Sequence, residues 1–599
     1  MNKDFKTDPS QNFMERLPQP LDAVFLPKTV AVIGAKDTPG SVGNTIMTNL
    51  IAGGFDGKIF PINPHRSEVH GLKVYPNISS VPEAIDLALV VTPAPTVPAL
   101  IEECVKCKVK SAVIISAGFK ELGPSGLELE KQILQHAHAA YMPIIGPNCL
   151  GVMNPIYGLN ATFAKGMALK GNIAFISQSG ALCTAVLDWS IQEKIGFSSF
   201  VSIGSMADVG WGALIDYLGG DPNTESILIY METVGDARSF LTAAREIALE
   251  KPIIVIKAGK SAAASKAVAS HTGSLAGSDD VFNAALERAG VLRVNSINEL
   301  FNMASVLGRQ SRPKGPHLGI VTNAGGPAVL ATDSVVFHGA QLAQLERTTI
   351  EAMNKKFPPA WSHSNPVDLL GDAGPDRYTL AIQKLAEDEN VDGILTILSP
   401  QDMTDSDAIA QCLVPYAHLP NKPMLASWMG GGTVKKGAEI LTNAGIPVFD
   451  YPDDAARTFS MMWKYSQNIK NLYQIPASLD ILSLGNLDQQ SNERAKKIIE
   501  NARQAKQFIL TEEESKSLLA CYGIPVVETH IAKTAEEAID LAERGVNRHP
   551  HFASGRVALG KCYFQKREFE KAIDQLKLAP HRLTAIDVQR VLEPNRLGN

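Results

Sequence analysis

The stretch from Thr29 to Gly43 reads TVAVIGAKDTPGSVG, a β-branched apolar run followed at once by a turn rich in small residues. Continuous apolar runs of this length are typical of a strand buried on both faces. The residues after the turn have the apolar spacing of a helix. A strand that turns through glycine into a helix begins a parallel α/β sheet, so this stretch predicts an α/β fold.

The same pattern occurs twice more. Asn172–Ser177 runs into a turn at 178–180, and Leu318–Thr322 runs into a turn at 323–327. The three first strands lie 143 and then 145 positions apart, counted between Val30, Ile173 and Leu318. This spacing predicts three consecutive domains of like architecture, and it is too long for a solenoid repeat.

Further apolar runs continue each unit with strands. In the first unit they lie at 58–62, 87–92, 112–116 and 142–145. In the second unit they lie at 226–230 and 252–257, and in the third at 393–398 and 424–427. Helices are predicted at 98–107 and 127–139, and linkers at 151–170 and 309–316. After a polar stretch at 475–506, the pattern predicts a helix at 511–519, a strand at 526–531 and a helix at 534–543.

Composition excludes several classes of protein. With 599 residues the chain should hold about four domains, and 45% apolar with 20% charged residues is ordinary for a globular protein. A net charge of −6 favours neither a nucleic-acid partner nor an anionic membrane. No apolar run is long enough to span a bilayer, and Met1–Leu17 has no signal-like apolar core. Seven cysteines, an odd and sparse number, predict a reduced cytoplasmic compartment.

The first glycine turn, Gly34 to Gly43, lies where backbone N–H groups and a helix dipole can hold a phosphate. A dinucleotide fingerprint needs G-x-G-x-x-G and an acidic residue about 20 positions further on. Neither is present, because the glycine spacing differs and the second strand runs into Asn63-Pro64. The sequence of this turn therefore disfavours binding of a nicotinamide nucleotide. Two interpretations stay open: the turn binds a different phosphate-bearing ligand, or it has only a structural role.

Three other groups of residues are candidates for a functional site. Ser177-Gln-Ser-Gly180 suits an oxyanion or phosphate, and equally an N-cap, as does the turn at 322–327. His271 lies among small residues in Ser270-His271-Thr-Gly-Ser-Leu-Ala-Gly277, open to approach, and Glu232 after a predicted strand is a candidate carboxylate partner. Cys104 and Cys107 have no second pair at ligand spacing, so a zinc site is disfavoured and no metal site is predicted.

Several motifs, taken in order, resemble one family. They are Gly34–Gly43, Gly146-Pro-Asn148-Cys-Leu-Gly151, Ser177–Gly180, Ser270–Gly277 and Asn365-Pro-Val-Asp-Leu369. The family is that of the NDP-forming acyl-CoA synthetases, which includes ADP-forming acetate–CoA ligase and is related to succinyl-CoA synthetase. The resemblance covers about Leu21 to Met462.

The resemblance implies a Rossmann-like CoA-binding domain, two flavodoxin-like doubly wound domains and a short α-helical C-terminal tail. In order, the implied segments are the CoA-binding domain at 20–150, the flavodoxin domain with the phosphohistidine at 165–308, a second flavodoxin-like domain at 312–470, a truncated ATP-grasp start at 507–545, and a tetratricopeptide-like tail at 546–599.

The resemblance also implies roles for particular residues. His271 is similar to the histidine that is transiently phosphorylated, and Glu232 to the acidic residue that holds it. The phosphoryl group would be cradled by Ser177, Ser179 and Gly180. The coenzyme A site would comprise Gly34, Thr38, Pro39, Gly40, Val42, Gly43, Asn63, Pro64, Thr92, Pro93, Ala94, Ser116, Ala117, Gly118 and Asn148.

The C-terminus departs from the family pattern. Leu510–Gly545 resembles the opening of an ATP-grasp domain, but the match stops before the lysines and metal-binding carboxylates of that domain. Leu559-Gly560-x-x-Tyr563 and the residues that follow resemble a tetratricopeptide repeat. The last 54 residues are interpreted as a fusion or reading-frame junction, or as a docking tail. ATP, ADP and Mg²⁺ would then bind only through a partner or a missing domain.

The resulting hypothesis is an ADP-forming acyl-CoA (acetate–CoA) ligase. It would interconvert acyl-CoA, phosphate and ADP with acid, CoA and ATP through acyl phosphate and phosphohistidine. Its partners would be a small carboxylic acid, CoA, and an ATP-grasp subunit or further copies of itself, with no nucleic acid or membrane. The alternative is a truncated protein lysine acetyltransferase whose ligase-like region senses CoA or acyl-CoA.

Overall fold

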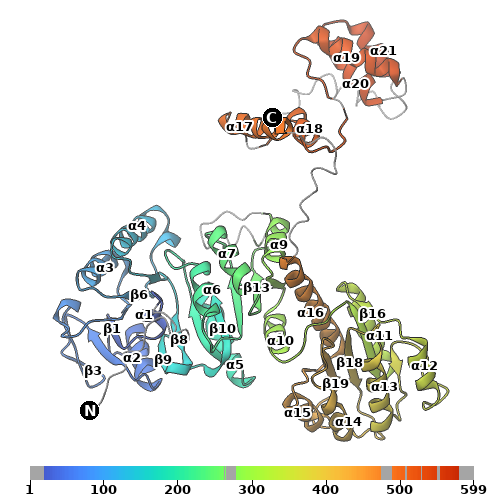
Figure 1. Ribbon diagram of the computed structural model, residues 1–599. Helices are drawn as coiled ribbons and strands as arrows, with labels where there is room; N and C mark the ends of the chain where they lie inside the picture. Colours follow the sequence, from blue (N-terminus) through green and yellow to red (C-terminus); the bar gives the residue numbers. More distant parts are fainter. Residues whose placement is uncertain are drawn as a thin grey trace, which may run out of the picture. The chain divides into compact units, whose positions relative to one another are not determined.

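The computed structural model describes residues 19–261, 264, 278–473, 489–505, 507, 509–527, 529–549 and 553–578 (Figure 1). The chain divides into two units, one ending at Tyr473 and the other beginning at Gln474. The first unit holds three α/β sheets that follow one another along the chain.

The first sheet is entirely parallel and has the strand order β2-β1-β5-β6-β7. Every residue of β1 is buried, as its apolar run predicts. The strands are β1 (Thr29–Ile33), β2 (Lys58–Ile62), β5 (Leu87–Val90), β6 (Ser111–Ile114) and β7 (Ile144–Ile145), with a small hairpin of β3 (Glu68–Val69) and β4 (Leu72–Lys73). The helices are α1 (Asp22–Phe25), α2 (Val42–Ala52), α3 (Val97–Lys106) and α4 (Pro124–Ala139).

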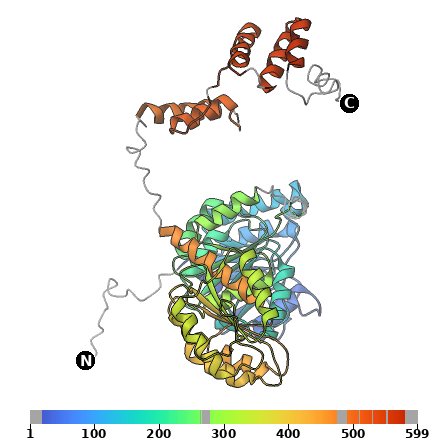
Figure 2. The same cartoon turned by 90° about the vertical axis from the view of Figure 1, so that its right-hand side faces the viewer.

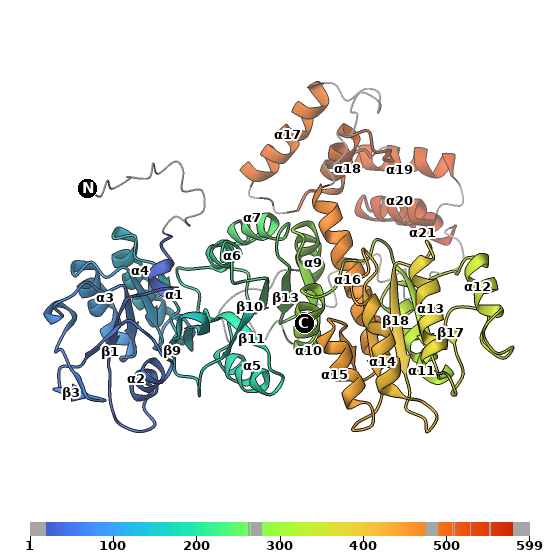
Figure 3. The same cartoon turned by 60° about the horizontal axis from the view of Figure 1, so that its bottom comes forward.

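The second sheet has the order β14-β13-β12-β10-β11-β8-β9. Its strands are β8 (Gly151–Asn154), β9 (Leu159–Thr162), β10 (Leu169–Ser177), β11 (Gly196–Ser202), β12 (Ser226–Met231), β13 (Ile253–Lys257) and β14 (Leu292–Val294). Its helices are α5 (Gly180–Gln192), α6 (Trp211–Gly219), α7 (Ala237–Ile247), α9 (Asp279–Arg288) and α10 (Ile297–Leu307). Helices α6 and α7 lie on one face and α5 and α10 on the other, so the sheet is covered on both sides (Figure 3).

The prediction of a linker at 151–170 is wrong. This segment forms β8 and β9, which add to the second sheet as antiparallel strands, and the start of β10. All eight residues of β8 and β9 are buried, including Asn160 and Thr162, whose side chains hydrogen-bond each other at 2.7 Å. Pairing of this kind hides polar residues that sequence patterning assigns to a loop.

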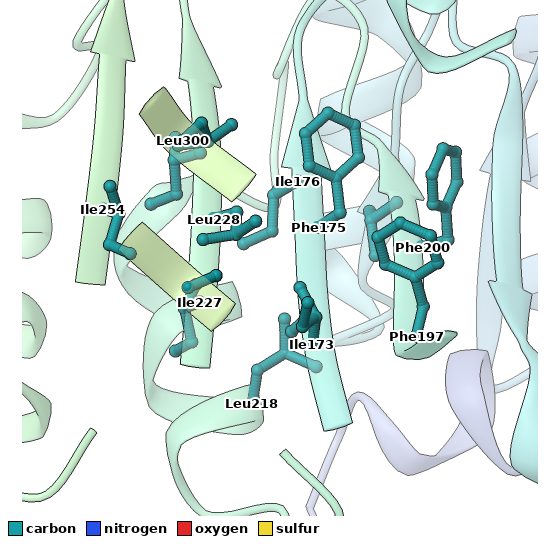
Figure 4. Packing of buried hydrophobic residues seen from close by; sticks show 14 of the residues in the cluster. Ile173, Phe175, Ile176, Phe197, Phe200, Leu218, Ile227, Leu228, Ile254 and Leu300 are labelled. Carbon is teal, nitrogen blue, oxygen red and sulfur yellow. The ribbon is translucent and has the colours of Figure 1, made fainter. Parts of the chain in front are cut away.

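The core of the second sheet is apolar on both faces. Phe175 and Phe200 have ring centroids 5.1 Å apart, and Phe175 also stacks with Phe301 of α10 at 6.1 Å. Figure 4 shows the rings of Phe175 and Phe200 beside the aliphatic side chains of the neighbouring strands. This cluster is continuous with buried residues of the first and third sheets, while each of those two domains also has a hydrophobic cluster of its own.

The third sheet is parallel, with the order β16-β15-β18-β19-β20 and β17 paired to β15. Its strands are β15 (His317–Thr322), β16 (Gln341–Leu342), β17 (Val367–Asp368), β18 (Gly393–Leu398), β19 (Met424–Trp428) and β20 (Val448–Phe449). Its helices are α11 (Gly325–Phe337), α12 (Arg347–Asn354), α13 (Pro375–Glu387), α14 (Ser406–Leu413), α15 (Lys435–Asn443) and α16 (Pro452–Tyr473). The three sheets confirm the α/β prediction, and the segment 309–316 between the second and third has no helix or strand, as predicted.

Helix α16 joins the third domain to the second. It packs along α11 and also contacts α10 and β14 (Figure 2). The Asn468 amide donates to the Val291 carbonyl at 3.1 Å across 177 positions of sequence. Gly290 has φ +74, and a Cβ there would lie 2.5 Å from Leu472, so this close approach requires glycine.

The second unit is helical where it is described. It contains α17 (Gln489–Gln504), α18 (Glu512–Cys521), α19 (Ala535–Arg548), α20 (Ala553–Gln565) and α21 (Phe569–Lys577). The predicted strand at 526–531 is wrong: the residues described there have no neighbouring strand, and Val527 and Ile531 are exposed. The predicted boundary after Gly545 falls inside α19, where Val546 packs against Leu559 and Tyr563. Among the described residues no helix has the length and apolarity needed to cross a membrane.

Asn49 provides a test of the junction between the first two domains. Its buried amide donates to the Thr162 and Ala164 carbonyls, both at 2.8 Å. Asn49→Ala leaves two buried acceptors without donors, so we expect the free energy of unfolding to fall by about 2 kcal/mol. Urea titration measures it, with the exposed neighbour substitution Thr48→Ala as the control. Equal stability of the two variants would contradict this role.

Candidate functional site

The predicted ligand residues of the first domain gather at one edge of its sheet. Parallel strands end on the same edge, and the observed strand order places the residues after those ends in a row. In order along the edge they are Asn63, Gly34, Thr92, Ser116 and Asn148. This edge is where ligands bind in open parallel sheets.

The glycine turn is built by close approach of helix α2 to the end of β1. Gly34 has φ +99, and a Cβ on Gly43 would lie 2.4 Å from the Gly34 carbonyl oxygen. Ser41 caps the helix by accepting a hydrogen bond from the Asn44 N–H at 3.3 Å. The predicted residues Thr38, Pro39, Gly40 and Val42 are exposed on this turn. The first-turn N–H groups of α2 are therefore presented beside an open loop, as binding of a phosphate requires.

Asn63 holds the turn rather than presenting its amide to solvent. The side chain is buried, donates to the Ala35 carbonyl at 2.9 Å and accepts from the His65 N–H at 2.9 Å. The next residues bring Arg66 to the same turn, where its guanidinium contacts Asp37 and donates to the Thr38 hydroxyl at 3.1 Å. The sequence interpretation missed Arg66, although its place just after Asn63-Pro64 at the end of β2 is the signal that could have found it.

The remaining loops of this edge are tied to one another. Ser116 donates to the Thr92 carbonyl at 2.5 Å, and the Asn148 N–H donates to the Ser116 carbonyl at 2.9 Å. A Cβ on Gly118 would lie 3.0 Å from the Cβ of Ala94, so the two loops touch. The predicted residues Pro93 and Ala117 lie in these same loops, and Pro64 follows Asn63 in the loop after β2.

The second domain repeats the arrangement at the end of β10. The buried Ser177 hydroxyl donates to the Ser179 carbonyl at 3.0 Å and accepts from the Ser179 N–H at 3.1 Å. Ser179 caps α5, which begins at Gly180, by accepting from the Leu182 N–H at 3.3 Å. The N-cap interpretation of this motif is therefore confirmed, and the backbone groups at the start of α5 face the same edge as the end of β12.

Gln178 fixes the position of Glu232. Its side-chain oxygen accepts from the N–H groups of Glu232 and Thr233, at 2.6 and 2.7 Å, and its nitrogen donates to the Thr233 hydroxyl at 2.8 Å. This bridge joins the ends of two neighbouring strands, β10 and β12. The sequence interpretation listed the small residues around Gln178 and overlooked the one side chain that positions the carboxylate.

A small polar pocket joins the two domains. Its lining comes from the first domain at Lys120, Glu121 and Asn148, and from the second at Gln178, Gly204, Ser205, Glu232 and Thr233. The Lys120 ammonium donates to the Ser205 carbonyl, and a Glu121 oxygen accepts from the Gly118 N–H at 2.6 Å. Asn148 at the edge of the first sheet and Glu232 at the edge of the second therefore line one pocket, with a lysine between the domains.

His271 lies outside the described residues. Gly259 and Ser278, which lie before and after His271 in the sequence, line a cavity together with Glu232. Strand β13, which leads toward this segment, pairs with β12 so that Lys257 lies opposite Met231. The predicted pairing of His271 with Glu232 stays a prediction.

Burial perturbs two other groups beside Glu232. Desolvation, reinforced by the Glu232 charge, raises the pKa of Tyr230. Desolvation also lowers the pKa of Lys257, whose ammonium donates to the Ala258 carbonyl at 2.5 Å. Cys104, by contrast, is a buried core residue of α3, and burial raises the pKa of its thiol to about 12.

In the third domain, the turn between the first strand and the following helix is closed by the same pattern of hydrogen bonds. The Thr322 hydroxyl donates to the Ala324 carbonyl at 2.9 Å and accepts from the Ala324 N–H at 3.0 Å. Asn323 bridges to the next strand by donating to the Ser399 carbonyl and accepting from its N–H. Asn365 is structural, since its amide bonds to the backbone of Leu318, Ile320 and Ala343.

Four family models match successive parts of the chain. They are the CoA binding domain at residues 28–155, the succinyl-CoA ligase like flavodoxin domain at 170–307, the Ligase-CoA domain at 318–469 and the ATP-grasp domain at 501–546.

Individual relatives match over most of this chain. An ADP-forming acetate–CoA ligase I of Archaeoglobus fulgidus is 40% identical over 523 residues, which is 87% of this chain and 74% of that protein. The alpha subunit of ADP-forming acetate–CoA ligase I of Pyrococcus furiosus is 41% identical over 75% of this chain and 98% of its own length. The solved acetyl-coenzyme A synthetase 1 of Ca. Korarchaeum cryptofilum, in complex with phosphate and ADP, is 36% identical with a TM-score of 0.69, and covers 76% of this chain and 98% of that one.

Lys257 predicts a dependence of stability on pH. Because its pKa is lowered in the folded state, the cost of a half-buried ammonium is present at neutral pH. That cost is lost as pH rises from the lowered pKa toward the ordinary value of 10.5. Relative to Lys257→Met, the wild-type protein should become more stable over this alkaline range. Thermal unfolding of both proteins across pH measures the difference, and a difference that falls with pH would contradict the assignment.

Proposed function

Since this chain belongs to the family of ADP-forming acetate–CoA ligases, which are acid–thiol ligases, we propose that it interconverts acyl-CoA with free acid and CoA through a phosphohistidine. The observation that carries the proposal is the polar pocket where the edge of the CoA-binding domain meets Glu232. In that pocket a thioester bound to the first domain would lie beside the carboxylate that serves His271.

Coenzyme A is proposed to bind along the carboxyl edge of the first sheet. The fit rests on the exposed glycine turn at the start of α2, which only glycine permits at Gly43, and on Arg66 as a nearby cation. Asn63 would hold this turn, and the loops of Thr92, Ser116 and Asn148 would complete the edge toward the second domain. The thiol end would then reach the pocket lined by Asn148 and Lys120.

The proposed chemistry needs three transfers. A phosphate oxygen attacks the thioester carbonyl, the C–S bond breaks, and CoA leaves as a thiolate that takes up a proton. A ring nitrogen of His271 then attacks phosphorus, and the acid leaves as carboxylate. The phosphoryl group finally passes from nitrogen to ADP. Glu232 accepts a hydrogen bond from the other ring nitrogen and stabilises the charge that develops, while the start of α5 at Ser177, Ser179 and Gly180 cradles the phosphoryl group.

The last transfer is proposed to need a second chain. The ATP-grasp match ends at residue 546, before the part of that domain that would bind nucleotide and Mg²⁺. A relative that matches 75% of this chain over 98% of its own length is named an alpha subunit, which supports a separate nucleotide-binding partner for this chain. ADP, ATP and Mg²⁺ would bind through that partner.

The cytoplasm is the proposed compartment. All seven cysteines are free, as in reduced compartments. The alternative of an acetyltransferase with a CoA-sensing region has no support in the comparisons, whose relatives are ligases.

The first test concerns the ligand of the first domain. Calorimetry on the full chain should detect CoA and no tight binding of NADH, because the turn lacks the dinucleotide spacing. Gly43→Ala should weaken CoA binding at least tenfold, since its methyl group would displace the start of α2 from Gly34. Thr48→Ala, exposed on the same helix, is the matched control. Tight binding of NADH, together with no detectable binding of CoA, would contradict the proposal.

The second test concerns the phosphohistidine. Given an acyl-CoA and radiolabelled phosphate, the chain should acquire an acid-labile, base-stable label. His271→Asn should abolish the label and retain CoA binding, and Glu232→Gln should slow labelling at least tenfold because it removes the charge that stabilises the imidazolium. Glu246→Gln, exposed on α7, should label at the wild-type rate. Unchanged labelling in His271→Asn would refute the assignment.

A further inference from the structure

Lys120 of the first domain reaches into the second domain. It is the first residue of a short 3-10 helix, Lys120–Leu122, that follows strand β6. Its half-buried side chain crosses to the loop after β11, where the ammonium donates a hydrogen bond to the Ser205 carbonyl. The same side chain lines the polar pocket together with Asn148 and Glu232. A cation of the first domain therefore lies where the thioester end of CoA is proposed to arrive.

The place of this ammonium is fixed by the backbone of both domains. The Ser205 N–H donates to the Pro147 carbonyl at 2.8 Å, so the residue that accepts from Lys120 is tied to the neighbour of Asn148. Gly204 has φ +58, and a Cβ there would lie 2.3 Å from the Pro147 carbonyl oxygen. An ammonium has three N–H donors, and the Ser205 carbonyl is its one hydrogen-bond acceptor among the described residues. Two donors can thus serve a bound anion.

The charges around Lys120 are mostly negative. Among the described residues that line the pocket Lys120 is the only cation, while Glu121 and Glu232 are acids. One Glu121 oxygen accepts from the Gly118 N–H at 2.6 Å, and the other is buried with no hydrogen-bond partner in the described part of the chain. Burial raises the pKa of Glu130 on α4, and the charge of Lys120 opposes that rise. A phosphate dianion in this pocket would add to an excess of negative charge, so its binding depends on the one ammonium there.

We propose that Lys120 is a catalytic residue of the first transfer, in which its ammonium binds the inorganic phosphate that attacks the thioester. This inference rests on the proposed function. One oxygen of hydrogen phosphate bonds to the carbonyl carbon, the C–S bond breaks, and the proton of the phosphate passes to the departing thiolate. The products are acyl phosphate and the CoA thiol, and Lys120 keeps its proton throughout. Its charge offsets that of phosphate before the attack and that of acyl phosphate after it.

Lys120 and the start of α5 serve different steps. The N–H groups at Gly180 belong to the second domain, and their proposed role is to cradle the phosphoryl group during its transfer to His271. Lys120 belongs to the first domain, as do the loops proposed to bind CoA, so its ammonium is near the group that phosphate must attack. Removal of its charge should therefore impair the use of phosphate without impairing CoA binding.

The test follows release of the CoA thiol by the full chain in a single turnover without nucleotide. The thioester is the one that the wild-type protein cleaves fastest among acetyl-, butyryl- and phenylacetyl-CoA, and the phosphate concentration is varied. Lys120→Met should raise the phosphate concentration that gives half of the maximal rate at least tenfold. CoA binding, measured by calorimetry, should stay within twofold. Lys120→Arg, which keeps the charge, should stay within threefold of wild type, and Lys131→Met, exposed on α4, should not differ from it.

Glu121→Gln should change the same quantity in the opposite direction. It removes one negative charge from the pocket and keeps an oxygen that can accept from the Gly118 N–H. We expect the half-saturating phosphate concentration to fall at least threefold. If Lys120 only tied the two domains together, the two variants would not produce opposite shifts. Lys120→Gln, which can still donate to the Ser205 carbonyl, should behave as Lys120→Met and replaces it if that variant does not fold.

The outcomes separate this inference from the proposed function. If the wild-type chain releases no CoA thiol from any of the three thioesters in the presence of phosphate, the proposed function fails. If it does release the thiol, and Lys120→Met leaves the half-saturating phosphate concentration unchanged or weakens CoA binding equally, the proposed function stands and the assignment of Lys120 is overturned.

Discussion

One side-chain oxygen, that of Gln178, accepts two backbone N–H groups at 2.6 and 2.7 Å and thereby sets the end of strand β12 against the end of β10. Glu232 begins the loop held by this bridge, so the backbone that carries its carboxylate cannot shift without breaking these hydrogen bonds. The polar pocket and the cavity beside Gly259 and Ser278 both have Glu232 in their lining. A half-buried amide that makes three hydrogen bonds is a rigid support, and the position of the loop that begins at Glu232 depends on it.

The strands that the sequence predicts well are those buried on both faces. Gly393–Leu398 is buried throughout and has the predicted bounds, because a continuous apolar run is buried on both faces of such a sheet. Lys58–Ile62 also has the predicted bounds, with its last three residues buried. The segment 151–170 was missed as strand, since β9 buries Asn160 and Thr162, and β8 pairs with β11, in which Phe200 lies opposite Met153 across 47 positions of sequence. Val526–Ile531 shows the reverse: apolar residues form no strand without a neighbour to pair with.

The residues of the site also differ in how far the sequence could predict them. Glycine and capping residues could be found because their backbone roles are local, as at Gly43 and Ser179. Arg66, Lys120 and Gln178 act on residues 28, 85 and about 55 positions away, so only the fold shows what they contact. For the same reason the cavity lined by Glu232, Gly259 and Ser278, whose wall also includes Lys120 of the first domain, leaves no local signature.

The position of helix α16 affects how the second domain can fold while the chain is being synthesised. It closes over the end of the second domain, where Asn468 satisfies a carbonyl 177 residues earlier in the chain. A ribosome that adds about 5 to 20 residues per second needs roughly 9 to 35 seconds to cover that interval. Throughout it Leu472 and Ile469, which lie against Gly290, are missing, although the strands of the second sheet have all been synthesised. The nascent second domain thus presents an apolar patch to the cell until the third domain is nearly complete, and chaperones would meet it there.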